Sequence, residues 1–261
     1  FRPSAGETLT LNSGITFSSG SFIAASSGGG TVAFNGSISG TSKIWVVSGS
    51  TAEFGTTTSA PLIDISDNST IRFTTSGAYT SNIEIEDTAT IDTGANTVSI
   101  SGTVTDDGTN ALAKTGTGTL TLSGTNSASG TMTVSQGTLS VAADSNLSAG
   151  AVTLNGGTLA VTGATTINNA IVLGASHGTV NVGADVTMSG VVSGTGNLTK
   201  TGASTLTLSG TNTYTGTTTV TGGSLSVSTD GNLGTGNVAL NGGGLTVTGA
   251  TTIDNDITGT G

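Results

Sequence analysis

Apolar and polar residues alternate along the chain in short runs, and Gly, Asn, Ser or Asp separates most runs from the next. This alternation has the period of a β-strand with one buried face, whereas no window has a convincing helical period. Pairs of apolar residues two positions apart recur at nearly regular steps: Leu120 and Leu122, Leu139 and Val141, Leu159 and Val161, Val180 and Val182. A period of roughly 20 residues that holds two or three short strands predicts one coil of a parallel β-solenoid.

A longer repeat overlies this period. Residues 114–171 align without a gap on residues 200–257, with 38 identities in 58 positions. The apolar residues kept in both copies are Leu120/Leu206, Leu122/Leu208, Val134/Val220, Leu139/Leu225, Val141/Val227, Leu147/Leu233, Val152/Val238, Leu154/Leu240, Leu159/Leu245, Val161/Val247 and Ile167/Ile253. Because Ser, Thr, Ala and Gly interchange between them, we predict a fixed buried face and a variable solvated face.

The segment 1–110 keeps the alternation without the repeated phrase. Its predicted inward side chains are larger: Phe17, Phe34, Phe54, Phe73, Ile83 and Ile85. Trp45 fits either the core or the surface. No linker separates the two halves, so we predict a single solenoid domain over residues 1–261. Its coils are irregular at 1–110, and residues 111–261 hold two copies of the 86-residue repeat, the second truncated.

The composition favours order and argues against several functions. Charged residues are 8% of the chain and hydrophobic residues 33%, which is the reverse of a disordered composition. The net charge is −10 and only five residues are basic, so we expect no nucleic-acid partner. Cysteine is absent, which excludes disulfides and thiolate metal sites. No apolar run of 18 residues that could form a transmembrane helix and no signal sequence is recognisable, and a start at Phe1 suggests a processed or excised piece.

One acidic segment, NIEIEDTATID, offers candidate chemistry. Glu84, Glu86, Asp87 and Asp92 could bind a cation or a sugar, and a pair of carboxylates flanks the scissile bond in many glycosidases. However, Glu84 and Glu86 are also the outward residues of an alternating strand. We therefore interpret them as part of a solvated strand face.

Other polar motifs favour turns. Two segments resemble fragments of calcium loops: DISDNS, with Asp64, Asp67 and Asn68, and TDDGTN, with Asp106 and Asp107. Neither has the spacing of an EF-hand, so we interpret them as structural turn carboxylates. His177 is the only histidine and has no catalytic partner at motif spacing, which indicates a turn residue. The triplets at 28–30 and 242–244 lack the helix of a phosphate-binding loop and are interpreted as corners. We predict no catalytic, cofactor-binding or metal-binding residue, and no cofactor.

The repeated phrase resembles a known family. LTKTGASTLTLSGTNTYTGTTTVTGGSLSV, residues 198–227, is similar to the autotransporter-associated β-strand repeat, also called the passenger-associated transport repeat. The matching positions are Lys200, Thr201, Gly202, Leu206, Leu208, Gly210, Asn212, Tyr214, Gly216, Thr219, Val220, Gly223 and Leu225, and in the earlier copy Lys114, Thr115, Gly116, Gly118, Leu120, Leu122, Gly124, Asn126, Gly130, Val134, Gly137 and Leu139. The earlier copy departs at Ala128, where the later one has tyrosine, and the later copy departs at Ser204.

The resemblance implies a right-handed parallel β-helix in a large secreted or surface-displayed bacterial protein. Such passengers are often exported by an outer-membrane barrel, which would lie elsewhere in the full chain. The family repeat carries no catalytic residues. It therefore implies a non-enzymatic extracellular segment, namely a stalk, adhesin or fibre, located outside the cell or on its surface.

Two alternatives remain open from the sequence. One is a filament subunit that stacks end to end, because open solenoid ends expose unpaired strand edges. The other is a polysaccharide-active β-helix enzyme with Glu84, Glu86 and Asp92 as its carboxylates, although the short turns leave little room for long loops over one face. Expected partners are further copies of the chain, or host, cell-surface or matrix molecules. We expect no nucleic acid and no membrane insertion by this segment.

Overall fold

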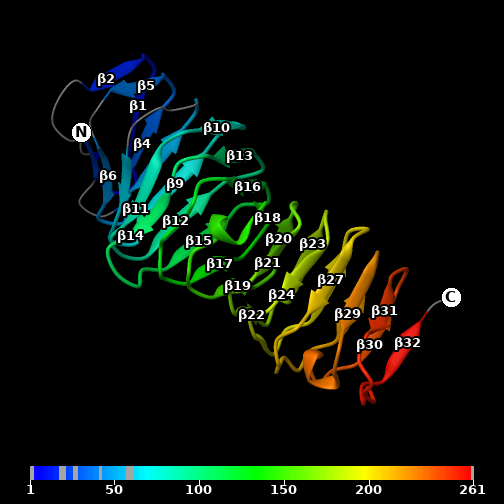
Figure 1. The fold of residues 1–261 in the computed structure, drawn as a ribbon. Helices are drawn as coiled ribbons and strands as arrows, with labels where there is room; N and C mark the ends of the chain where they lie inside the picture. Colours follow the sequence, from blue (N-terminus) through cyan, green and yellow to red (C-terminus); the bar gives the residue numbers. More distant parts are fainter. Residues whose placement is uncertain (1–2, 18–21, 26–28, 41–42, 57–61, 260–261) are drawn as a thin grey trace. The chain divides into compact units, whose positions relative to one another are not determined.

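The computed structural model describes residues 3–17, 22–25, 29–40, 43–56 and 62–259. Short strands of three to five residues dominate, and the only helices in these ranges are single 3-10 turns, η1 (Asp144–Asn146) and η2 (Asp230–Asn232). Equivalent strands of consecutive coils pair in parallel, as where Thr138 is aligned with Thr158. The predicted all-β solenoid, with roughly 20 residues per coil, is confirmed (Figure 1). None of the described helices is long and apolar enough to span a membrane.

The chain divides into two compact units, one of residues 1–132 with 145–149 and one of residues 133–144 with 150–261. The strand β17 (Met132–Val134) contributes residues to both. Each unit has its own core. The expectation of a single domain stays a prediction.

The first unit contains four parallel arrangements of strands. The order of the largest is β1 (Thr8–Leu11), β4 (Thr31–Phe34), β7 (Thr51–Phe54), β9 (Thr70–Phe73), β12 (Ala89–Asp92) and β15 (Leu112–Thr115). The others are β3 (Phe22–Ala25), β6 (Ile44–Val47), β8 (Leu62–Ile65), β11 (Asn82–Ile85) and β14 (Val104–Asp106); β10 (Gly77–Tyr79), β13 (Thr97–Ile100) and β16 (Thr119–Leu122); and β2 (Ile15–Phe17) with β5 (Ile38–Gly40).

Aromatic stacking fills the core of this unit. Phe34, Phe54 and Phe73 are aligned in register and fully buried, with ring centroids 5.4 and 6.0 Å apart, and Tyr79 continues the stack at 4.5 Å. The inward positions predicted for these three phenylalanines are confirmed, as are those of Ile83 and Ile85. The side chain of Phe17 lies outside the described part of the structure. Trp45 faces outward and is 36% exposed.

The second unit contains three parallel arrangements. They are β18 (Thr138–Val141), β20 (Thr158–Val161), β23 (Gly178–Val182), β26 (Leu198–Thr201), β28 (Thr218–Val220), β30 (Val238–Leu240) and β32 (Ile257–Gly259); β19 (Val152–Leu154), β22 (Ile171–Leu173) and β25 (Val192–Gly194); and β21 (Thr165–Ile167), β24 (Val186–Met188), β27 (Thr205–Leu208), β29 (Ser224–Val227) and β31 (Gly244–Val247). Within each, a strand pairs with the equivalent strand of the next coil.

The buried face predicted from the repeat is confirmed for most of its positions. All eleven residues of the first copy are buried, as are the first seven of the second. The remaining four, Leu240, Leu245, Val247 and Ile253, are partly or largely exposed, and Val247 reaches 41%. The prediction is wrong for these four because an inward side chain is fully covered only when coils lie on both sides of it, and they belong to the last coils described.

The tyrosine that distinguishes the second copy has a matching glycine. Tyr214 is fully buried, and its hydroxyl lies 2.6 Å from Thr218 Oγ1. A Cβ atom on Gly234 would lie 2.2 Å from the backbone oxygen of Tyr214 and 2.6 Å from its ring atom Cδ2, so the close approach of the two coils requires the glycine. The first copy holds the smaller Ala128 and, at the position equivalent to Gly234, Ser148. In each copy, the size of the side chain at the first position is thus compensated by the size of the residue at the second position, in the next coil.

Candidate functional site

Three carboxylates gather on the outward face of β8 and β11. Asp64 of β8 lies in register with Glu84 of β11, and Glu86 follows directly after that strand. One oxygen from each side chain lies within 4.8 Å of the others. The outward direction predicted for Glu84 and Glu86 is confirmed by their exposure, but the sequence analysis assigned Asp64 to a separate turn motif. Stacking of consecutive coils brings it beside them.

A lysine from the preceding coil contacts this cluster. Lys43 Nζ lies 2.6 Å from Asp64 Oδ2 and 3.1 Å from Glu84 Oε2. The hydrogen bond to Asp64 outweighs desolvation and, with the contribution of Glu84, raises the pKa of Lys43. The same ammonium lies 5.3 Å from the centre of the Trp45 ring, and Trp45 is aligned with Asp64 in the sheet. The tryptophan therefore borders the acidic cluster.

Burial makes this cluster electrostatically unusual. The Asp64 side chain is only 1% exposed, and its second oxygen, Oδ1, has no hydrogen-bond partner. Desolvation, together with the negative charge of Asp64, raises the pKa of Glu86 above its usual range. Three carboxylates face one ammonium, so the cluster carries excess negative charge.

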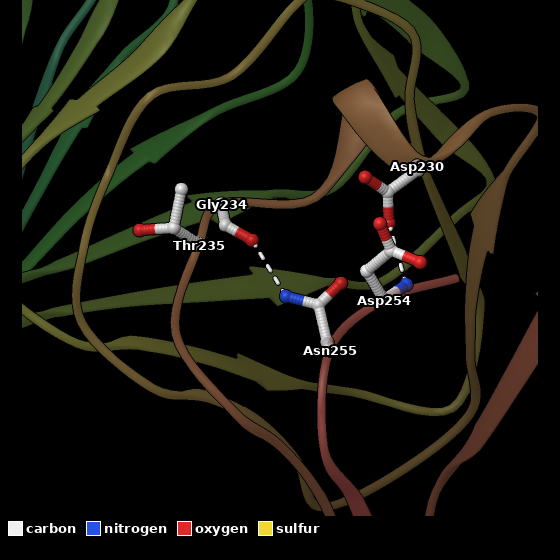
Figure 2. A pocket seen from close by; sticks show the side chains of 5 residues that line it. All are labelled: Asp230, Gly234, Thr235, Asp254 and Asn255. Atoms are coloured by element: carbon white, nitrogen blue, oxygen red, sulfur yellow. Dashed lines mark hydrogen bonds between the residues drawn. The ribbon is translucent and has the colours of Figure 1, made fainter. Parts of the chain in front are cut away.

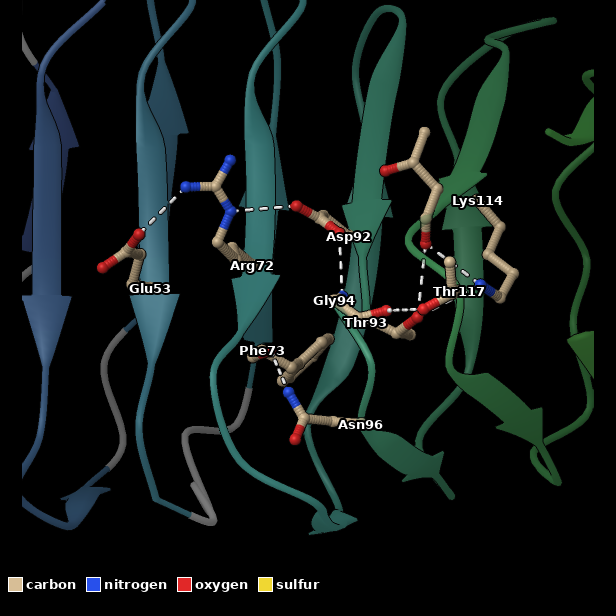
Figure 3. Close-up of polar contacts among 10 residues, drawn as sticks. Glu53, Arg72, Phe73, Asp92, Thr93, Gly94, Asn96, Lys114 and Thr117 are labelled. Carbon is tan, nitrogen blue, oxygen red and sulfur yellow. Dashed lines mark hydrogen bonds and ion pairs between the residues drawn. The ribbon is translucent and has the colours of Figure 1, made fainter. Parts of the chain in front are cut away.

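The fourth acidic candidate lies apart. Asp92 belongs to β12, in a different sheet from β11, where Arg72 bridges it to Glu53 at distances of 2.9 and 3.0 Å (Figure 3). Burial alone would raise the pKa of Asp92, but the hydrogen bond from the Gly94 N–H and the Arg72 guanidinium together lower it. Glu84 and Glu86 are thus brought together and Asp92 is not, and Asp92 is held ionised by its partners.

Two lysines are buried inside the coils. Lys114 is 1% exposed, and its Nζ donates to Thr93 Oγ1 and to the carbonyls of Thr115 and Gly116 (Figure 3). Lys200 is the equivalent residue in the second copy and is fully buried. Its Nζ contacts four carbonyl oxygens, those of Thr201, Gly202, Ser204 and Gly222, at 2.7 to 3.2 Å. These ammonium groups replace the hydrogen bonds that the corners would otherwise take from water.

Buried asparagines play a similar role at another corner. Asn212 Oδ1 accepts the Val192 N–H at 2.7 Å, and Asn232 Nδ2 donates to the Gly210 carbonyl at 3.0 Å. In the first copy Asn126 accepts the Val104 N–H in the same way. Sequence reasoning based on apolar positions missed these lysines and asparagines. The available signal was that Lys114/Lys200, Asn126/Asn212, Asn146/Asn232 and Asn169/Asn255 are identical between the copies.

The buried position of Lys114 predicts a pH dependence. Desolvation lowers its pKa from 10.5 to about 8 in the folded protein, so the unfolded chain binds more protons between these two values. The free energy of unfolding should therefore rise with pH from about 8 to 10.5, by up to about 1.4 kcal/mol per pH unit from this group. Urea titrations should show a smaller rise in Lys114→Met than in the native chain; Lys200, whose pKa is also lowered by burial, still contributes a rise in the variant. Equal pH profiles for both would contradict it.

Most of the predicted turn residues lie in turns, but the prediction is wrong for Asp64 and Asp106, which belong to the strands β8 and β14. Asp67 and Asn68 have φ of 55° and 59°, and Asp67 Oδ2 accepts the Ser48 N–H. Asp106 accepts the N–H groups of Ser129 and Gly130, and Asp107 accepts Asn110 Nδ2. His177 has φ of 67°, and its Nδ1 accepts the Asn197 N–H at 3.0 Å. Of the glycine triplets, Gly242 has φ of 97° as a corner requires, whereas Gly28 lies outside the described residues.

A pocket of about 170 Å³ lies beside η2 and is lined by Asp230, Gly234, Thr235, Asp254 and Asn255 (Figure 2). Asp230 Oδ1 accepts the Asp254 N–H at 2.9 Å, and Asn255 Nδ2 donates to the Gly234 carbonyl at 2.7 Å. In the first copy, Asn168 stands in place of Asp254 and donates to Asp144. The pocket is therefore one more corner of the repeat, formed by the hydrogen bonds that hold consecutive coils together.

Comparison with known protein families identifies the phrase that contains these lysines and asparagines. Residues 112–141 and 198–227 each match the passenger-associated transport repeat. The first match runs from β15, which contains the buried Lys114, to β18. The second runs from β26, which contains the buried Lys200, to β29. Comparison with curated proteins and with solved structures found no match. The resemblance predicted from the sequence is confirmed: the chain carries two copies of the passenger-associated transport repeat.

Proposed function

We propose that this chain is a non-enzymatic structural segment of a bacterial surface or secreted protein, serving as part of a stalk, adhesin or fibre. The observation that carries the proposal is the pair of transport repeats folded into stacked coils. Their identical residues are used for packing and for hydrogen bonds at corners. The net charge of −10 is consistent with a solvated extracellular surface.

The arrangement of the acidic residues argues against the polysaccharide-active alternative. A general acid and a second carboxylate must face the same glycosidic bond, yet Asp92 lies in another sheet and is paired with Arg72. Lys43 forms ion pairs with Asp64 and Glu84. A carboxylate engaged by an ammonium is a weak nucleophile and a weak acid.

The chain should therefore hydrolyse no polysaccharide. Incubation with pectin, alginate and similar polymers should release neither reducing ends nor unsaturated products. A variant with Glu84→Gln, Glu86→Gln and Asp92→Asn serves as the matched control. Product released by the native chain and lost in this variant would favour the enzyme.

The proposed location can be tested on intact cells. An antibody raised against residues 1–261 should label intact cells that express the parent protein, and external protease should remove the label. Labelling only after lysis would contradict an extracellular role.

The filament alternative is tested by sedimentation. The purified chain should sediment as one species over a range of concentrations. Growth of long polymers would favour end-to-end stacking.

A further inference from the structure

We propose that Asp64, Glu84 and Glu86 bind one divalent cation of the Ca²⁺ class on the outward face of β8 and β11. The sequence alone predicts no metal-binding residue among them. The three carboxylates offer oxygens within 4.8 Å of one another. Ca²⁺ binds oxygen ligands at roughly 2.3–2.6 Å, so two ligands of one ion are separated by at most about 5 Å. The cluster has the dimensions of a single coordination sphere.

The buried oxygen of Asp64 is an independent indication of a ligand. Its side chain is 1% exposed and Oδ1 has no hydrogen-bond partner, although Oδ2 is paired with Lys43. A buried carboxylate oxygen without a partner is costly and rare. Glu84 and Glu86 offer only acceptors when ionised, and the hydrogen bond between Glu86 and Asp64 that helps to raise the pKa of Glu86 requires a proton on Glu86. A cation between the three carboxylates would satisfy Oδ1 while leaving the Lys43 contact in place.

The charges around the cluster favour a divalent ion. Three carboxylates and the Lys43 ammonium leave two negative charges when all groups are ionised. Asp107 adds a further negative charge that contributes to the raised pKa of Glu86. A divalent cation would neutralise this excess negative charge.

The donor set selects the class of metal. All three side chains present oxygen, and the group contains neither nitrogen nor sulfur donors. Carboxylate oxygens suit Ca²⁺, Mg²⁺ and Mn²⁺ rather than Zn²⁺ or Cu²⁺. Glu86 is exposed, so water can complete the coordination sphere, and Ca²⁺ tolerates such an irregular set better than Mg²⁺.

The position of Trp45 allows a direct test. It is the only tryptophan, and its ring and Asp64 Oδ2 both contact the Lys43 ammonium, at 5.3 and 2.6 Å. Tb³⁺ should bind in place of Ca²⁺ and emit when tryptophan is excited. Added Ca²⁺ should displace it and abolish the sensitised emission.

Matched variants decide whether the cluster is the site. Glu86→Gln should weaken Tb³⁺ binding at least about tenfold, as should Asp64→Asn. Asp92→Asn removes a carboxylate outside the cluster and should leave binding unchanged. Glu86 is exposed, so this variant keeps the test valid if Asp64→Asn fails to fold. Absence of sensitised emission from the native chain, or equal emission from native and Glu86→Gln chains, would overturn the proposal.

Discussion

Replacing Leu208 with aspartate should unfold the coils around β27. Leu208 is 1% exposed and is stacked in register on Met188 of β24. The change removes a large apolar side chain and places an unpaired charge in the core. Together these should lower the free energy of unfolding by at least about 4 kcal/mol. Urea titration followed by circular dichroism measures the loss.

Thr207→Asp is the matched control, because Thr207 is the neighbouring residue of the same strand and faces outward. Substitutions at solvent-exposed positions usually change the free energy of unfolding by less than about 0.5 kcal/mol. Hydrogen exchange in residues 186–227 should therefore accelerate strongly in Leu208→Asp and little in Thr207→Asp. Equal destabilisation by the two variants would mean that the inward register of β27 is wrong.

The fold was predictable because a solenoid repeats one physical requirement at every coil. An inward position must stay apolar and of constant volume, whereas its outward neighbour is free to vary, and this difference is visible in a single sequence with internal repeats. The apolar pair Leu206 and Leu208 therefore correctly predicted the strand β27 and its inward face. Burial of Leu245 and Val247 was predicted wrongly, because the sequence pattern shows which way a side chain points but not whether another coil covers it.

The polar interior was harder to predict because charge and burial normally oppose each other. No local pattern predicted the burial of Lys114 and Lys200. In the structure the backbone at each corner turns its carbonyl oxygens inward, and Gly202, with φ of 83°, allows one such turn. The identity of the lysines in both copies was the only sequence signal.

The acidic cluster depended on a long-range register that no local motif shows. Asp64 and Glu84 belong to consecutive coils and meet only because β8 and β11 pair with Asp64 opposite Glu84. A shift of one residue would turn Asp64 inward and Ile63 outward. Knowledge of the coil length to the exact residue would be needed to predict it, and the irregular coils before residue 110 do not supply that length.

Replacing Lys200 with methionine should destabilise the second repeat even though methionine is apolar and of similar length. The Nζ group contacts four carbonyl oxygens with three N–H donors, so at least one donor is shared. Methionine donates none, and the buried carbonyl groups would lose this donor. With roughly 1–3 kcal/mol for each group left unsatisfied, the free energy of unfolding should fall by about 3–5 kcal/mol.

Thr199→Met, one residue earlier in β26 and facing outward, adds the same side chain without removing a donor and should cost less than about 1 kcal/mol. Lys114→Met should likewise lower the free energy of unfolding, because that ammonium also donates to corner carbonyls, those of Thr115 and Gly116. Hydrogen exchange across residues 198–227 localises the effect, since Trp45 lies in the other unit and does not report on it. If Lys200→Met were as stable as Thr199→Met, the buried lysine of the repeat would contribute nothing to stability. The corner carbonyl groups would then be satisfied without it.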